Sequence, residues 1–287
     1  MEDQFAYIKY LPIDKSWIIR MGVLDMLDNS DNIQKFLEKQ ANLSDDLLAL
    51  QRASRVWKGN EPVNIGESGT LYRFLRFASW KLNLNKKFVI SGTLKNRKLT
   101  NNPDIVDLSQ EELLKLDNNT SQWASAKVLL GDRERLDNPP YKLKLTYEAV
   151  EHWELQKNKG EGWIPRLDET ILRQAQSYRA LLKGLDSGFY PIQAEDFCFA
   201  YGFGLTNSIE GEKKWPNLHG HESDRIKEIE TMLEKAKKGM AIDSKDHRVV
   251  QAIAMWAKVN DKKIQILYPD SVNKSWPRFW EFLSLHS

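Results

Sequence analysis

Short apolar segments in this chain alternate with longer segments of helical periodicity, and small polar residues join them. Four apolar segments have the length and composition of strands, at 5–10, 63–65, 88–90 and 264–267. Segments with helical spacing accompany them, at 17–27, 33–37, 47–56, 71–78, 108–116, 123–130, 145–153, 171–185, 222–238 and 249–259. The recurring order of strand, loop and helix predicts an α/β fold.

The length of the chain bounds the number of domains. Its 287 residues correspond to one large or two ordinary domains, and no stretch is rich enough in Gly, Ser and Pro to act as a flexible linker. The longest apolar runs, such as 88–90, fall far short of the roughly eighteen residues that cross a bilayer. The first residues, Met1-Glu2-Asp3-Gln4, lack the basic region of a secretory signal. We therefore expect a cytoplasmic monomer without a membrane segment.

The net charge argues against nucleic acid as a partner. The 42 Lys and Arg residues balance 40 Asp and Glu residues to a formal net charge of +2, and both signs are spread along the chain. A local cluster of cations can still bind a phosphate or carboxylate group. The single cysteine, Cys198, forms no internal disulfide, and His219-Gly220-His221 is more typical of a surface segment than of a metal site. We expect no metal and no cofactor.

Four of the predicted helices begin with small polar residues directly after an extended segment, where free backbone N–H groups can bind an anion. These starts lie at Ser16, 66–70, 118–122 and 139–141. Six cations lie near the ends of elements: Lys15, Arg20, Arg73, Arg97, Arg248 and Lys274. Each feature alone is also explained by ordinary helix capping and by solvated surface charge. Their order along the chain favours anion binding.

Six short blocks occur in one order along nearly the whole chain. They are Leu11-Pro12-Ile13-Asp14-Lys15-Ser16-Trp17-Ile18-Ile19-Arg20, Gly66-Glu67-Ser68-Gly69-Thr70-Leu71-Tyr72-Arg73-Phe74-Leu75, Thr120-Ser121-Gln122-Trp123, Asn138-Pro139-Pro140-Tyr141, Asp246-His247-Arg248 and Asn273-Lys274-Ser275-Trp276-Pro277-Arg278-Phe279-Trp280. In this order they resemble blocks of the enolpyruvyl transferases, such as Gly-Asn-Ala-Gly-Thr-x-x-Arg-Phe-Leu, Ser-Ser-Gln, Ser-x-Pro-Tyr and Asp-His-Arg. Six ordered blocks are more specific than any single one.

The resemblance implies a reaction and a set of binding residues. The enolpyruvyl (1-carboxyvinyl) group of phosphoenolpyruvate would pass to a hydroxyl of shikimate 3-phosphate or a similar phosphorylated acceptor, and phosphate would be released. The residues implied to bind the acceptor are Ser16, Arg20, Thr120, Ser121 and Tyr141. Those implied to contact phosphoenolpyruvate are Lys15, Gly69, Gln122, Arg248 and Lys274. Thr70, Arg97 and Asn138, which lie in matching segments, complete the expected binding residues.

The chain also departs from the pattern of the family. When Arg97 is aligned with the second arginine of the family's Arg-x-x-x-Arg-Pro segment, Thr93 stands where the first arginine should be. We find no segment like the Lys-Glu-Thr-Asp-Arg block, which supplies a proton-transferring glutamate and two cations. The segment 241–248 aligns either with the family's Ile-Pro-Asp segment or with its Asp-His-Arg block, so the aspartate candidate is Asp243 or Asp246.

Two functional hypotheses of different class follow. A positioned acid or base typically contributes about 10²–10⁴-fold to a rate, so a shortened transferase needs a substitute for the missing glutamate. In such an enzyme, proton transfer would fall to Lys15, Asp246 or Glu195. In a non-catalytic or repurposed relative, only an anion-binding cleft would be kept. The retained cations favour the transferase, whereas Thr93 and the missing block favour the second hypothesis.

The resemblance also implies an architecture. It predicts a two-domain α/β fold in which each domain is an inside-out barrel of βαβαββ units. One domain would span 20–185, and the other would combine 1–19 with 186–287. The second domain would be truncated, and the ligand cleft would lie between the two domains.

Overall fold

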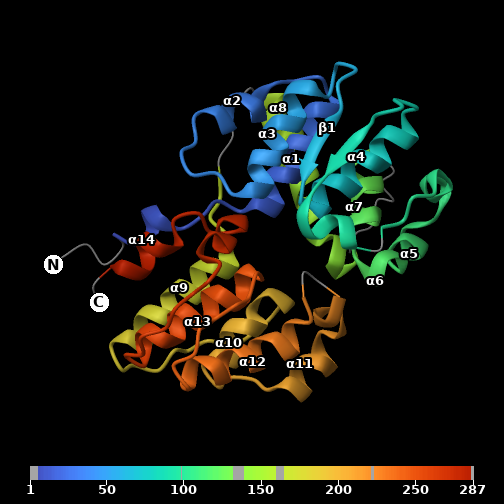
Figure 1. The fold of residues 1–287 in the computed structure, drawn as a ribbon. Coiled ribbons are helices and arrows are strands. Elements are labelled where there is room, and N and C mark those ends of the chain that lie inside the picture. Colours follow the sequence, from blue (N-terminus) through green and yellow to red (C-terminus); the bar gives the residue numbers. More distant parts are fainter. Residues whose placement is uncertain (1–5, 98, 132–138, 160–164, 221–222, 286–287) are drawn as a thin grey trace. The chain divides into compact units, whose positions relative to one another are not determined.

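The computed structural model describes residues 6–97, 99–131, 139–159, 165–220 and 223–285, and it is mostly helical (Figure 1). The chain divides into two compact units. One unit combines Met1–Pro12 with Leu167–Ser287, and the other is Ile13–Arg166. These divisions fall earlier along the chain than the 19/20 and 185/186 boundaries expected from the sequence, so each of the helices at 15–27 and 169–182 lies whole within one unit.

The unit Ile13–Arg166 contains all of the regular strands among the described residues. Its α-helices and strands are α1 (Lys15–Leu27), α2 (Asn32–Glu38), α3 (Asp45–Val56), β1 (Val63–Gly66), α4 (Gly69–Lys81), β2 (Phe88–Ile90), α5 (Gln110–Leu113), α6 (Leu116–Asn119), α7 (Gln122–Leu129) and α8 (Lys144–Lys159). The 3₁₀ helices among its described residues are η2 (Gly92–Asn96), η3 (Pro103–Asp107) and η4 (Tyr141–Leu143).

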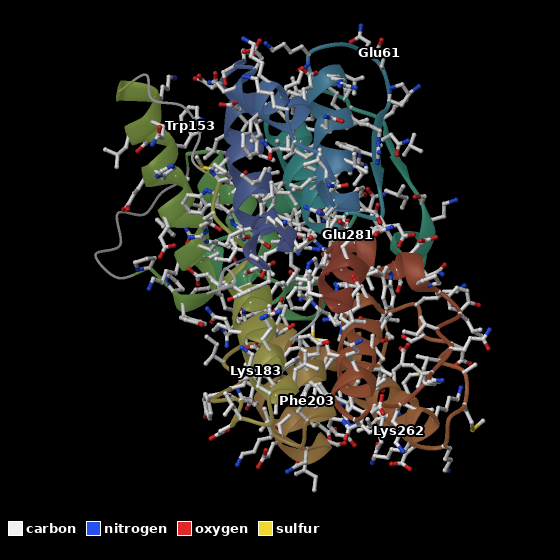
Figure 2. All side chains as sticks on the ribbon, turned by 90° about the vertical axis from the view of Figure 1, so that its left-hand side faces the viewer. Glu61, Trp153, Lys183, Phe203, Lys262 and Glu281 are labelled. Atoms are coloured by element: carbon white, nitrogen blue, oxygen red, sulfur yellow. The ribbon has the colours of Figure 1, made fainter. Side chains whose placement is uncertain are left out.

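Helix α1 lies at the centre of this unit and packs against α3 and α8 (Figure 1). All residues of α1 from Trp17 to Met26 are buried, including two charged ones. The buried carboxylate of Asp25 accepts hydrogen bonds from the Ile33 backbone N–H (2.7 Å) and from Nε1 of Trp153 on α8 (3.1 Å; labelled in Figure 2). A buried charge needs such donors, and here they tie α1 to α2 and α8.

Strands β1 and β2 form a parallel pair in which Val63 lies opposite Phe88 and Asn64 opposite Val89. Val63 and Ile65 are buried and Asn64 is exposed, which is the alternation expected when one face of a strand covers a core. The predicted strands at 63–65 and 88–90 are therefore confirmed.

The unit of Met1–Pro12 and Leu167–Ser287 is built around α13. Its α-helices are α9 (Glu169–Leu182), α10 (Phe197–Gly202), α11 (Ser208–Lys214), α12 (Arg225–Lys237), α13 (His247–Val259) and α14 (Phe279–Ser284). Its 3₁₀ helices are η1 (Ile8–Tyr10), η5 (Ala194–Asp196), η6 (Pro216–Gly220) and η7 (Pro269–Lys274). Helix α13 packs against α9, α10, α12 and η7, and nearly all of its residues are buried.

Two predicted strands are not regular strands. Residues Ile8–Tyr10 form a 3₁₀ helix, because the N–H of Leu11 donates to the Ile8 carbonyl and the Tyr10 carbonyl accepts from Nε1 of Trp276. The segment 264–267 contributes an isolated parallel bridge between Ile242 and Ile266. The described residues thus form one two-stranded sheet, which is compatible with an α/β fold, and they do not close a barrel.

None of the described helices has both the length and the apolar character that crossing a membrane requires.

Gly211 on α11 lies against the aromatic ring of Phe197, and we predict that Gly211→Ala destabilises the fold. A Cβ atom at this position would lie 2.2 Å from Cε2 of the fully buried Phe197 ring. Overpacking of this kind typically costs about 1–3 kcal/mol of the free energy of unfolding. Urea denaturation monitored by circular dichroism should show a lower midpoint for this variant.

Gly202→Ala is the matched control, because Gly202 is also a helical glycine of the same unit. Its added Cβ would have no neighbour nearer than 3.9 Å, the carbonyl oxygen of Ala252. We expect the midpoint of Gly202→Ala to stay at or slightly above that of the wild type, since alanine favours helix. Equal midpoints for the two variants would contradict the packing argument.

Candidate functional site

The turn between β1 and α4 leaves the start of α4 without a side-chain cap. Gly66 has a φ of +59°, in the left-handed region that favours glycine, and the turn continues through Glu67 into Ser68 at the N-cap position. The Ser68 hydroxyl makes no capping hydrogen bond. It is buried, and it has no hydrogen-bond partner within the part of the chain that the structure describes. The first N–H groups of α4 and this hydroxyl thus form a potential site for an anion.

Two guanidinium groups flank the first residue of α4. A Cβ atom added at Gly69 would lie 3.2 Å from Nη1 of Arg73 and 3.2 Å from Nη1 of Arg97. Burial lowers the pKa of Arg73, the nearby Asp117 carboxylate opposes this shift, and the positive charge of Arg97 adds to it. Two like charges near one helix N-terminus are stabilised by an anion between them.

Asp117 holds Arg73 in place. Its carboxylate accepts hydrogen bonds from Nε of Arg73 (2.8 Å), from Nε1 of Trp123 (2.9 Å), and from the N–H and hydroxyl of Thr100 (3.0 and 2.6 Å). Desolvation opposes the ionisation of Asp117, but hydrogen bonds from Thr100 and Arg73 outweigh it, so the pKa of Asp117 is lowered. Asp117 is therefore an ionised counter-charge at neutral pH.

Gln122, at the start of α7, connects Arg73 to Thr70. Nη1 of Arg73 donates to Oε1 of Gln122 (2.7 Å), and Nε2 of Gln122 donates to Oγ1 of Thr70 (2.7 Å). The structure thus brings together four predicted binding residues and Arg73, one of the six cations named from the sequence, and it adds Asp117. We name the six residues Gly69, Thr70, Arg73, Arg97, Asp117 and Gln122 the α4 cluster.

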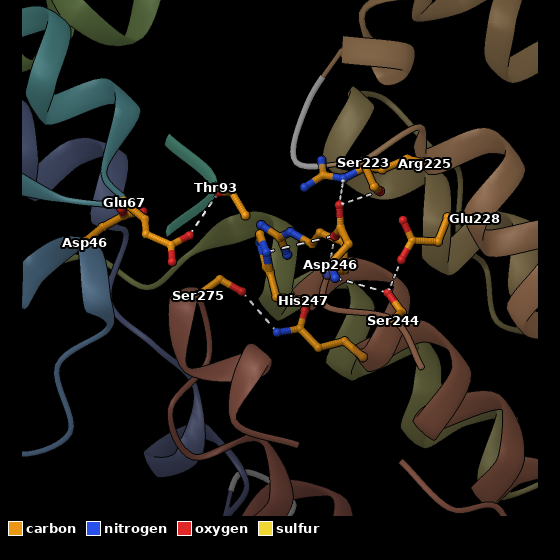
Figure 3. A network of polar contacts seen from close by, with 12 residues as sticks. Asp46, Glu67, Thr93, Ser223, Arg225, Glu228, Ser244, Asp246, His247 and Ser275 are labelled. Carbon is orange, nitrogen blue, oxygen red and sulfur yellow. Dashed lines mark hydrogen bonds and ion pairs between the residues drawn. The ribbon is translucent and has the colours of Figure 1, made fainter. Parts of the chain in front are cut away.

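Thr93, at the position where the resemblance would place an arginine, links the side chain of Glu67 to Arg97. Its hydroxyl donates to Oε2 of Glu67 (2.9 Å) and accepts from Nη2 of Arg97 (3.4 Å); Figure 3 shows the first of these contacts. Thr93 therefore adds no charge to the α4 cluster but contributes to the position of its second arginine.

Lys15 and Arg20 lie on α1, whose side-chain cap is Asp14 rather than the predicted Ser16. Nζ of Lys15 lies 2.6 Å from Oδ2 of Asp46 on α3. The Arg20 side chain is buried and donates to Oγ1 of Thr146 and to the Ser16 carbonyl, both at 2.8 Å. Burial lowers the pKa of Arg20 to about 10, although the charge of Asp14 opposes the shift.

The other residues of this unit that were predicted to bind the acceptor lie in different surroundings. The Thr120 hydroxyl accepts from the Gln122 backbone N–H (3.4 Å), and Ser121 occupies the N-cap position of α7 without a side-chain cap. Tyr141 is 80% exposed on η4, so it contributes little to the core and is available for other contacts. Asn138 lies outside the described residues.

A second polar network surrounds the start of α13. The buried carboxylate of Asp246 caps this helix through the Arg248 N–H (2.9 Å) and accepts from Nε of Arg225 (2.8 Å) and from the Ser223 hydroxyl (3.2 Å; Figure 3). The N–H of Asp246 donates in turn to the Ser244 hydroxyl (3.0 Å), which donates to Glu228. Asp246 therefore acts as the N-cap of α13 and as the counter-charge of Arg225.

Arg225 was not among the residues predicted from the sequence. The signal was present, because Glu222-Ser223-Asp224-Arg225 differs from the Glu-Thr-Asp-Arg part of the family block only by serine for threonine, with His221 in place of lysine. The statement that no such segment exists was therefore wrong. Residues 221 and 222 lie outside the described residues, whereas the Arg225 side chain is buried in the α13 network.

The other predicted residues of this unit are Arg248, Lys274 and Glu195. Arg248 is 6% exposed, and its Nη1 has no hydrogen-bond partner in the described residues. Lys274 ends η7, next to Ser275, whose hydroxyl accepts from Nε2 of Gln251 (3.0 Å). Glu195 is exposed on η5, while its neighbour Asp196 is the buried acid that pairs with Arg173 (2.7 Å).

Comparison with known proteins yields one informative similarity. The chain is 33% identical over 110 residues to 3-phosphoshikimate 1-carboxyvinyltransferase of Aquifex aeolicus (strain VF5). The match covers 32% of this chain and 24% of that protein, so the chain matches about a quarter of the length of its relative. No protein-family model and no solved structure matches the chain. The similarity supports a distant relationship.

We predict that Gly69→Ala weakens anion binding. The added Cβ, at 3.2 Å from both guanidinium groups, would displace them from the start of α4. We expect the dissociation constant for inorganic phosphate, measured by isothermal titration calorimetry, to rise about tenfold. Gly59→Ala is the control, since its nearest neighbour would lie at 3.6 Å. Unchanged phosphate binding by Gly69→Ala would exclude the start of α4 as the anion site.

Proposed function

We propose that this chain transfers the enolpyruvyl group of phosphoenolpyruvate to a hydroxyl of shikimate 3-phosphate or a similar phosphorylated acceptor. The observation that carries the proposal is the α4 cluster. There the start of α4, which has no side-chain cap and belongs to the segment 66–75 that resembles a family block, lies beside Arg73 of the same segment and Arg97 of a later one. The similarity to part of a 3-phosphoshikimate 1-carboxyvinyltransferase supports it.

The α4 cluster, which carries two arginines and one aspartate, suits a small anionic ligand. Phosphoenolpyruvate carries a phosphate and a carboxylate, and both need compensating donors once water is excluded. Arg73 is neutralised by Asp117 at 2.8 Å, so the ligand would be held by the remaining N–H groups of Arg73, by Arg97 and by the Gln122 amide. The proposal gives Arg248 and Lys274 the same role on the basis of the resemblance.

The acceptor would be bound by residues of a different type. Hydroxyl groups and an arginine suit a phosphate monoester, and Ser16, Thr120 and Ser121 supply the hydroxyls. Arg20 is available as a buried cation, because its hydrogen bonds go to the neutral oxygens of Thr146 and Ser16. Tyr141 and Asn138 are assigned to the acceptor by the resemblance.

Among the candidates for proton transfer, Lys15 is the one we favour. Asp46 holds its ammonium group at 2.6 Å, which positions it, whereas Asp246 is engaged by Arg225 and the α13 backbone. In the proposed reaction the acceptor hydroxyl adds to phosphoenolpyruvate to form a tetrahedral adduct. Loss of phosphate from this adduct then gives the enolpyruvyl ether.

A second candidate function is anion binding without turnover. Thr93, in place of an arginine, favours it, because it leaves the α4 cluster with one cation fewer than the family pattern. The exposure of Glu195 on η5 favours it as well, because an acid in water lacks the environment that tunes a catalytic group.

Single-turnover release of phosphate from phosphoenolpyruvate and shikimate 3-phosphate distinguishes the two functions. We expect release by the wild type and a loss of at least about 100-fold in Lys15→Met, because a positioned proton donor is removed. Lys39→Met, which changes an exposed lysine at the end of α2, is the control and should retain the wild-type rate. Absence of release by folded wild-type protein that still binds phosphate would establish the second function.

A further inference from the structure

We propose that Asp117 is a positioning residue that acts through Arg73 to orient the Gln122 amide. The α4 cluster then presents hydrogen-bond donors to its ligand and selects fully ionised oxyanion groups. The inference rests on the proposed function in taking the ligand of the α4 cluster to be an anion. It goes further by naming the ionisation state that the site selects and the residue that sets this selection.

The first step is the fixed position of Asp117. Each of its carboxylate oxygens accepts two hydrogen bonds: Oδ1 from the N–H and hydroxyl of Thr100, and Oδ2 from Arg73 and Trp123. The Asp117 side chain is only 3% exposed and the Arg73 side chain 8%. A carboxylate that accepts four hydrogen bonds cannot rotate without breaking several of these bonds. Asp117 therefore fixes the direction in which Nε of Arg73 donates.

The second step is the direction of the Gln122 amide. An arginine side chain can only donate hydrogen bonds, and Nη1 of Arg73 lies 2.7 Å from the Gln122 amide. The atom that faces Arg73 must therefore be Oε1, and the NH₂ group must face Thr70, at 2.7 Å. Arg73 thus decides which end of a nearly symmetrical amide points away from it, and Asp117 holds Arg73 where it makes this contact.

The third step concerns the protons that remain. One proton of Nε2 goes to the Thr70 oxygen, which leaves the second Nε2 proton and the Thr70 hydroxyl proton. Neither has an acceptor within the described residues. A ligand at this point therefore meets donors from Gln122 and Thr70 in addition to the guanidinium groups.

Ser68 provides an independent indication of a ligand at this place. Its side chain precedes Gly69, is 2% exposed and has no hydrogen-bond partner among the described residues. A buried hydroxyl without a hydrogen-bond partner destabilises the folded state. A bound oxyanion would satisfy this hydroxyl together with the first N–H groups of α4.

The consequence is a preference among anions. A phosphate group that keeps a proton presents a donor to a site composed mainly of donors, whereas a fully ionised phosphate or sulfate presents only acceptors. The α4 cluster should therefore bind the dianion of phosphate in preference to its monoanion. Sulfate, which is a dianion throughout the neutral range, should bind without this dependence.

The test compares inorganic phosphate with sulfate by isothermal titration calorimetry between pH 6 and pH 8. We expect the affinity for phosphate to rise about tenfold over this range, because the fraction of dianion rises. The affinity for sulfate reports any contribution from the charged groups that face the site, which are Arg73, Arg97, Asp117 and Glu67. An equal pH dependence for both ions would overturn the inference.

Three variants test the contacts from Asp117 through Arg73 to Gln122. Asp117→Asn turns an NH₂ group toward existing donors, so we expect the phosphate-to-sulfate affinity ratio to lose its pH dependence. Gln122→Glu replaces the remaining donor with an acceptor, and we expect sulfate affinity to fall at least tenfold while protonated phosphate becomes the preferred ion. Gln122→Met removes the donor without adding charge and should weaken both ions without reversing their order.

Circular dichroism establishes which variants are folded. If Asp117→Asn is not folded, the two Gln122 variants still test whether the hydrogen-bond donors select the dianion. A folded Asp117→Asn that keeps the wild-type ratio at each pH would overturn the positioning role. These measurements use ions that do not react, so they are independent of phosphate release. Selection of the dianion without release would support this inference and leave enolpyruvyl transfer unsupported.

Discussion

The ion pair between Asp117 and Arg73 organises the part of the molecule on which the functional argument depends. Placing an arginine at 6% exposure requires a counter-charge, and Asp117 supplies it at 2.8 Å. The same carboxylate binds Thr100 and Trp123, so one buried acid joins α4, α6, α7 and the chain before η3. Removing either partner would leave the other charge buried and unpaired. The position of Gln122 follows from this pair.

The other unit also contains a buried aspartate that pairs with a buried arginine, but in a different geometry. Asp246 binds Arg225 at 2.8 Å and caps α13, so here the acid itself occupies the helix start. At α4 the N-cap side chain makes no hydrogen bond, and the acid lies behind the arginine instead. A helix start that is already occupied by a carboxylate is not available to an anion. The two networks are therefore not equivalent, and the α4 cluster is the better anion site.

Local features of the sequence predicted the fold well where the partner groups are close along the chain. The strands at 63–65 and 88–90, the turn at Gly66 and the helices α4, α7, α9 and α13 follow from composition and periodicity. The 3₁₀ helix at Ile8–Tyr10 does not, because Trp276, 266 residues away, binds the Tyr10 carbonyl. Asp117 was missed for the same reason, since its partner Arg73 is 44 residues distant. Arg225 was not predicted, although the segment Glu222-Ser223-Asp224-Arg225 could have been recognised from the sequence alone.

A buried polar atom without a hydrogen-bond partner indicates a binding site only when charged side chains lie near it. The Tyr178 hydroxyl is also buried without a partner in the described residues, yet it lies in an apolar cluster, and its burial raises the pKa of that group. Ser68 and Arg248 differ because each lies at the start of a helix in a segment that carries cations. An unsatisfied group costs stability wherever it lies, and only a ligand of complementary charge recovers that cost. A buried polar group among apolar side chains, such as the Tyr178 hydroxyl, is thus part of the core. A buried donor without a partner that lies near cations, such as the Ser68 hydroxyl, indicates a binding site for an anion.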